Sequence, residues 1–110
     1  VRQRWFMGII RGILEEEHER LQNLSVFYEK KILEYPQGVI SIKERGGQKY
    51  IYLAYRKGKK VVFDYIGKDV PEERKALCAK LKQRKEYQAK LQQVKENLRE
   101  IERSLRGKRT

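Results

Sequence analysis

The spacing of apolar positions changes twice along this chain and so divides it into three parts. Apolar and aromatic side chains recur every three or four residues over residues 1–35 and again over residues 70–106, which is the spacing of an amphipathic helix. Pro36 and Gly38 end the first pattern, because proline lacks the amide that continues the helical ladder and glycine permits a sharp change of direction. The expected seams contain Ile10, Leu14, Leu21, Leu24, Tyr28 and Tyr35 in the first helix, and Leu77, Tyr87, Leu91, Val94, Leu98, Ile101 and Leu105 in the second.

Residues 39–67, between the two helical patterns, alternate apolar and polar side chains in the manner of strands. Gly46–Gly47 and Gly58 divide this stretch into three runs, and glycine supplies the positive φ values that tight hairpins require. We therefore predict a three-stranded antiparallel β-meander. Asp69 as a capping residue and Pro71 in the first turn predict where the second helix starts.

Residues 1–35 and 71–105 are equal in length, and the two predicted helices are opposite in charge, with a balance of −3 over residues 13–34 and +7 over residues 71–110. This favours pairing, so we predict an α+β fold: a long antiparallel, coiled-coil-like helical hairpin with the β-meander at its tip, in a single domain over residues 1–110. In this register residue 34 lies near residue 72 and residue 1 near residue 105. Gly8 and Gly12 would permit close helix approach, and the segment from Trp5 would pack against the end of the second helix. The alternative is dimerisation through the C-terminal helix, so monomer and homodimer both stay open.

Positive charge is concentrated in the predicted meander. The chain carries a formal net charge of +12, and residues 43–68 contain eight Lys or Arg side chains against Glu44 and Asp64, together with four of the seven tyrosines. A basic, tyrosine-rich ribbon is typical of proteins that contact a phosphate backbone. The predicted nucleic-acid-binding residues are Lys43, Arg45, Lys49, Tyr50, Tyr52, Arg56, Lys57, Lys59, Lys60 and Lys68.

Strand alternation separates the two faces of the ribbon. Ile51 and Leu53 fall on an apolar face suited to packing on a helix, whereas Tyr50, Tyr52 and Arg56 fall on a polar, aromatic and cationic face. The second face suits insertion of strands into a DNA major groove, or stacking of tyrosines on unpaired bases. The alternative interpretation is that the lysines discourage edge-to-edge aggregation and that the tyrosines belong to the core.

The sequence gives little indication of catalysis. His18, the only histidine, lies in an acidic helical run without a second imidazole, and Cys78, the only cysteine, is expected to be a small half-buried helical residue. No phosphate-binding or dinucleotide-binding loop is present. We expect a protein that is not an enzyme, with no catalytic residue, metal or cofactor. The apolar run from Trp5 is short and interrupted by Arg11, so we expect a cytoplasmic protein with no membrane partner.

The segments 36–40, 48–61 and 65–68 carry a resemblance to a small, uncharacterised prokaryotic family with a ribbon between charged helices. Its pattern is a Pro-x-Gly, a Tyr-x-Tyr-Leu-x-Tyr-Arg-x-Gly-Lys ribbon and a Tyr-Ile-Gly-Lys exit. The ribbon also resembles N-terminal segments of some insertion-sequence transposases. More loosely, it resembles the arm-site DNA-binding domain of phage integrases, whose sheet enters the major groove, although both helices here are longer. These resemblances imply DNA as a ligand and a link to mobile elements.

Two functions follow as expectations. The first is a non-enzymatic nucleic-acid-binding protein related to a phage or mobile element, with DNA favoured over RNA. The second is a coiled-coil protein-interaction module that acts as an adaptor or inhibitor of a larger nucleoprotein complex. In the second case Tyr52 and Arg56 would anchor a protein partner, because tyrosine and arginine are enriched in interface hot spots.

Overall fold

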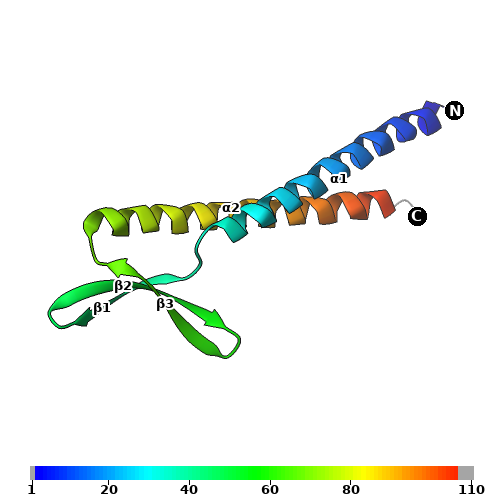
Figure 1. Cartoon of the computed structure of the whole chain (residues 1–110). Helices are drawn as coiled ribbons and strands as arrows, with labels where there is room; N and C mark the ends of the chain where they lie inside the picture. Colours follow the sequence, from blue (N-terminus) through cyan, green and yellow to red (C-terminus); the bar gives the residue numbers. More distant parts are fainter. Residues whose placement is uncertain (1, 107–110) are drawn as a thin grey trace. The chain divides into compact units, whose positions relative to one another are not determined.

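The computed structural model describes the backbone of residues 2–106 and the side chains of residues 8–106. Helix α1 (Arg2–Glu34) is followed by strands β1 (Val39–Arg45), β2 (Gln48–Lys57) and β3 (Lys60–Lys68), and then by helix α2 (Pro71–Arg106) (Figure 1). This order confirms the predicted α+β fold of helix, β-meander and helix. The expected packing of Trp5 concerns a side chain outside the described residues.

The chain divides into two compact units. A helical unit combines the residues up to Ile32 with those from Tyr87 onward, and a sheet unit comprises Leu33–Glu86. Helix α2 is continuous and contributes its first part to the sheet unit and its second part to the helical unit. Within the part of the chain that the structure describes, neither helix has a stretch apolar enough to span a bilayer.

The sheet has the order β1-β2-β3, and both neighbouring pairs are antiparallel. Two-residue turns join the strands, because Arg45 pairs with Gln48 in the first hairpin and Lys57 pairs with Lys60 in the second. Gly46 and Gly47 both have positive φ, at 57° and 78°, as a type I′ turn requires. Gly58 has φ of 66° at the first turn position, which fits a type II′ turn.

One face of the sheet packs on the first part of α2. Ile51 is fully buried, and Leu53 and Leu77 complete the buried cluster, with Ile40 and Leu81 packed against it. The prediction that Leu77 belongs to a helix–helix seam is therefore wrong. A sheet face that carries isoleucine and leucine needs an apolar cover, and in this unit α2 provides it.

The loop that follows α1 makes close contacts within the sheet unit. Gly38 has φ of 117°, and a Cβ atom on it would lie 2.6 Å from the carbonyl oxygen of Ala54, so only glycine fits. Arg84 Nη1 donates a hydrogen bond of 2.7 Å to the carbonyl oxygen of Tyr35. The chain therefore leaves α1 opposite residue 84, and the predicted proximity of residues 34 and 72 is wrong.

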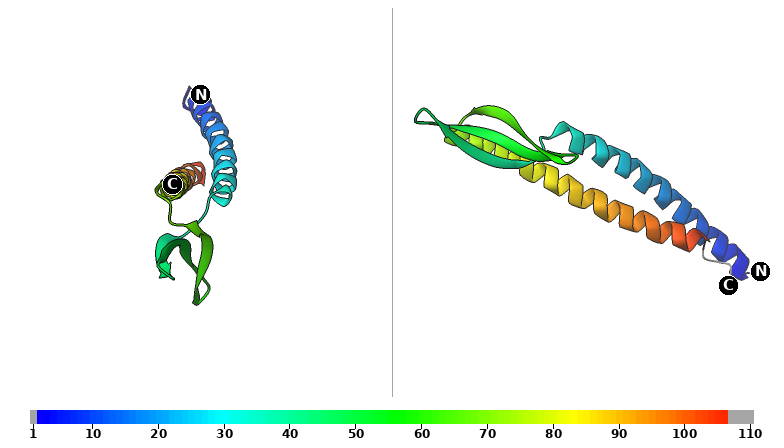
Figure 2. Two further views of the ribbon diagram at one scale, coloured as in Figure 1. Left: turned by 60° about the vertical axis from the view of Figure 1, so that its left-hand side comes forward. Right: turned by 90° about the horizontal axis from the view of Figure 1, so that it is seen from below.

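The helical unit pairs its two segments in antiparallel orientation, with the start of α1 and the end of α2 at the same end (Figure 2). Arg11 Nη1 donates to the carbonyl oxygen of Leu105 at 3.4 Å, and the rings of Tyr28 and Tyr87 lie 6.0 Å apart. Residue 11, rather than residue 1, thus lies beside residue 105, because the first turns of α2 cover the sheet instead of pairing with α1. Among the side chains of this unit that the structure describes, Leu21, Ile32 and Val94 are buried.

Two smaller expectations about the helices are also corrected. A Cβ atom on Gly8 or Gly12 would meet nothing within 4 Å, so these glycines permit no close helix approach. The amide of Arg74 donates to the carbonyl of Val70, which makes Val70 and not Asp69 the capping position of α2. The carboxylate of Asp69 instead accepts a hydrogen bond of 2.8 Å from Arg74 Nε.

Candidate nucleic-acid interface

The strand register defines the sheet face that points away from the buried cluster. Ile51 and Leu53 of β2 are buried, and alternation therefore directs Tyr50, Tyr52 and Arg56 to the opposite face. The two ladders extend this face across all three strands. This outer face consists of Val39, Ser41, Lys43 and Arg45 of β1, Gln48, Tyr50, Tyr52, Ala54 and Arg56 of β2, and Val61, Phe63, Tyr65 and Lys68 of β3.

An aromatic cluster occupies the middle of the outer face. The ring of Tyr65 lies 5.5 Å from that of Tyr52 in an edge-on arrangement and 6.2 Å from that of Tyr50. Phe63 lies in the next cross-strand row, opposite Ala54. Phe63 and Tyr65 are 45% and 59% exposed, so this cluster is not core. We call Tyr50, Tyr52, Phe63 and Tyr65 the aromatic platform.

Lys43 brings a cation onto this platform. Its ammonium group lies 3.8 Å from the centroid of the Phe63 ring and 4.9 Å from that of the Tyr52 ring. Each such contact at an exposed site stabilises by about 0.5–1 kcal/mol. The lysine therefore holds its positive charge over the rings, close to where a planar ligand would meet them.

Further cations stand at both ends of the platform. Arg45 and Lys68 lie toward the first hairpin end of β2, and Arg56 lies near the second hairpin. The acidic strand residues take the other face, since Glu44 pairs with Lys49 and Asp64 pairs with Leu53. Residues 39–68 are all described, and within them the outer face carries four cations and no carboxylate.

The structure brings together some of the predicted contact residues and separates others. Lys43, Arg45, Tyr50, Tyr52, Arg56 and Lys68 share the outer face. Lys49, Lys57 and Lys60 occupy alternate strand positions directed toward the opposite face, and Lys59 lies in the second turn. The period of two in a strand causes this division, because neighbouring basic residues cannot share a face.

Sequence reasoning missed Phe63 and Tyr65 as members of this surface. The signal was available in the second turn: a two-residue loop at Gly58 fixes the pairing of Lys57 with Lys60. Counting along the ladder from that pair brings Phe63 opposite Ala54 and Tyr65 opposite Tyr52. The apolar alternation of β3 therefore continues the platform instead of contributing to the core.

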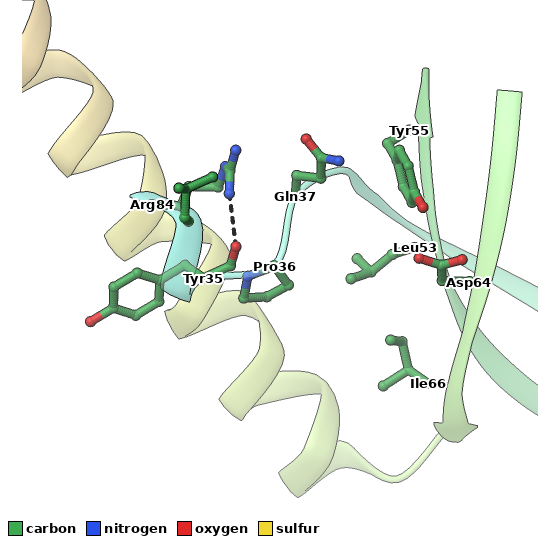
Figure 3. A pocket seen from close by; sticks show the side chains of 9 residues that line it. Tyr35, Pro36, Gln37, Leu53, Tyr55, Asp64, Ile66 and Arg84 are labelled. Atoms are coloured by element: carbon green, nitrogen blue, oxygen red, sulfur yellow. Dashed lines mark hydrogen bonds between the residues drawn. The ribbon is translucent and has the colours of Figure 1, made fainter. Parts of the chain in front are cut away.

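A pocket of about 380 Å³ lies on the helix-facing side of the sheet (Figure 3). Its apolar walls include Leu33, Pro36 and Leu53. Asp64 accepts a hydrogen bond from the Tyr55 side chain, and this bond, helped by burial, raises the pKa of the Tyr55 phenol above its ordinary value of 10.0.

The remaining candidates for chemistry stay dispersed. Cys78 is exposed, so the expectation of a half-buried cysteine is wrong. His18 Nε2 lies 3.0 Å from Glu102 Oε2 in the helical unit. Among the side chains of residues 8–106, no three His, Cys, Asp or Glu residues gather in an arrangement that could hold a metal ion.

Comparison with known proteins gives one match. A family model described as "Domain of unknown function (DUF6788)" matches residues 14–76, which include most of α1, the whole sheet and the first turn of α2. This match covers more than half of the chain, and the chain belongs to the DUF6788 family. No curated protein and no solved structure shows significant similarity to it.

Proposed function

We propose that this member of the DUF6788 family is a non-enzymatic nucleic-acid-binding protein that contacts its ligand through the outer face of its sheet. The observation that carries the proposal is the composition of that face. It combines an exposed aromatic platform with Lys43, Arg45, Arg56 and Lys68, and its strand positions include no carboxylate. A polyanion that also offers aromatic bases matches both properties.

Electrostatics set the scale of the expected interaction. Besides the four cations of the outer face, Lys59 lies in the second turn, and Lys57 and Lys60, although directed toward the opposite face, place further positive charge at that hairpin. If about six phosphates are neutralised, the logarithm of the affinity falls with the logarithm of salt concentration with a slope of roughly −5 for a duplex and −4 for a single strand. A slope of this size distinguishes phosphate contacts from an interaction made mainly by apolar side chains.

Fluorescence polarisation with labelled duplex DNA, single-stranded DNA and RNA at two salt concentrations tests this proposal. A variant with Arg45→Glu, Arg56→Glu and Lys68→Glu should lose most of the affinity. The matched control changes Lys80, Lys82 and Lys85 of α2 to glutamate, with the same change in net charge away from the outer face. Equal losses in the two variants would mean that only overall charge matters, and absence of binding by the parent protein would refute the proposal.

A second candidate is a protein-interaction module that acts as an adaptor or inhibitor of a nucleoprotein complex. The exposed Tyr65 and Phe63 beside Arg56 favour it, because aromatic residues and arginine dominate interface hot spots. This function would give no useful affinity for free nucleic acid. Instead, one protein partner would co-purify with the chain. A variant with Tyr52→Ala and Arg56→Ala would no longer bind this partner, although its helix content, measured by circular dichroism, would be unchanged.

The biological setting is part of the proposal and rests on resemblance. The likeness of the ribbon to transposase segments and to integrase arm-binding domains supports DNA over RNA and a role connected with a phage or mobile element. The cytoplasmic location is proposed separately, from the short apolar run that Arg11 interrupts. RNA in the polarisation series tests the preference for DNA directly, since preferential binding of RNA would contradict it.

A further inference from the structure

We infer that the outer face takes single-stranded nucleic acid and stacks its bases on the aromatic platform, in preference to docking on a duplex. This inference rests on the proposed function and assigns its ligand class. Four aromatic rings lie within two neighbouring strands, and the two rings on β3, Phe63 and Tyr65, are 45% and 59% exposed. Exposed rings gathered on one sheet face carry apolar surface that a stacked base would remove from water.

The chemistry of the platform suits base faces better than base edges. A duplex covers the faces of its bases by stacking and offers only hydrogen-bonding edges in its grooves. Phe63 has no hydrogen-bonding group with which to read such an edge, although it lies near the centre of the outer face, between the row of Tyr52 and Tyr65 and the row of Arg56. Unpaired bases present the π surface that can stack on partly exposed rings such as those of Phe63 and Tyr65.

The cations are arranged to complement a strand laid across this platform. Lys68 and Arg45 stand at one end of the outer face and Arg56 at the other, and the positions of β2 between Gln48 and Arg56 span about 26 Å at 3.3 Å per residue. Sheets of comparable width stack two or three bases on their aromatic residues. Phosphates on either side of the stacked bases would then meet the terminal cations, with the Lys43 ammonium group beside the rings.

The test compares three probes of equal length: a labelled thymidine strand of about 20 nucleotides, a duplex, and a strand of abasic sites that keeps the phosphates but lacks bases. The parent protein should bind the thymidine strand about tenfold or more tightly than the abasic strand, because loss of one stacked base weakens binding by roughly fivefold to 150-fold. It should also bind the thymidine strand more tightly than the duplex at the same salt concentration.

A Phe63→Ala, Tyr65→Ala variant should lose this preference and bind the thymidine and abasic strands equally, with an unchanged salt slope. Phe27→Ala is the matched control, since Phe27 is a similarly exposed aromatic residue (48%) on α1 in the helical unit. Tyr65→Ser alone serves as a second, milder variant, and thermal denaturation of each variant checks that the sheet is intact.

The possible outcomes distinguish a failure of the single-strand inference from a failure of the proposed nucleic-acid binding. Equal or tighter binding of the duplex, or an equal loss on all three probes in the platform variant, would overturn the single-strand inference and leave nucleic-acid binding in place. Absence of binding to every probe would overturn both. If the parent protein then sediments as a dimer that the platform variant abolishes, the outer face is an interface between copies of this chain.

Discussion

At the scale of single residues, Gly38 is the position where the backbone is least able to accept a side chain. Its φ of 117° lies in a region that other residues avoid, and an added Cβ would press on the Ala54 carbonyl oxygen at 2.6 Å. We expect Gly38→Ala to lower the free energy of unfolding by about 1–3 kcal/mol. Thermal or urea denaturation followed by circular dichroism measures this loss.

Gly12 provides the control for that substitution because the chemical change is identical and the surroundings are open. It lies in α1 with nothing within 4 Å of the added Cβ. Gly12→Ala should therefore raise the free energy of unfolding by about 0.5–1 kcal/mol through helix propensity alone. Two substitutions with the same sign and size would show that Gly38 is not conformationally restricted.

The hydrogen bond between Tyr55 and Asp64 gives a pH prediction at the same scale. The folded state holds the proton of the Tyr55 phenol more tightly than the unfolded chain, since the bond to Asp64 raises its pKa above the ordinary 10.0. The resulting stabilisation is fully present below pH 10.0 and is lost as the pH rises through the raised folded-state pKa. Asp64→Asn should move the Tyr55 titration, followed by ¹³C NMR of the ring, to lower pH. An identical titration in parent and variant would contradict this assignment.

At the scale of elements, the sequence predicts the sheet well and the helix register poorly. Glycines at both hairpins determine turn geometry, and each two-residue turn sets the register of the strands that it joins, so the meander and most of its two faces follow from local signals. The register shift between Ile51 and Tyr52, beyond which Lys68 pairs with Tyr50, has no such signal in the turn. Apolar residues that recur every three or four positions predict a helix, but this spacing does not show which element each of them packs against. By spacing alone, Leu77 could pack against α1 or against the sheet. In the structure it packs in the buried cluster with Ile51.

The same distinction explains what was missed in the candidate site. Lysines that are adjacent in sequence suggest one basic patch, yet alternation sends Lys49 and Lys60 to the face opposite Lys43. Apolar side chains in β3 suggest core, although the buried face already has its cover in α2. Composition therefore indicates the kind of ligand, whereas the register indicates which residues meet it.

At the scale of the whole molecule, two compact units share one continuous helix, and each has its own buried residues. Leu77 belongs to the sheet unit and Val94 to the helical unit. We expect Leu77→Ala to destabilise by about 2 kcal/mol or more and Val94→Ala by less, because the cost follows the volume removed. Amide hydrogen exchange measures where protection is lost: in β2 for Leu77→Ala, and in α1 around Leu21 for Val94→Ala.

Hydrogen exchange in Leu77→Ala and Val94→Ala also tests which buried residues keep the outer face rigid. A platform that must meet a ligand in a fixed arrangement needs a rigid sheet, and the cluster of Ile51, Leu53 and Leu77 is what holds β2 against α2. If exchange in β2 rises only with Leu77→Ala, the sheet unit carries its rigidity independently of the helical unit. Equal loss of protection across both units in each variant would instead show one cooperative fold, in which the helical unit is required to keep the platform in shape.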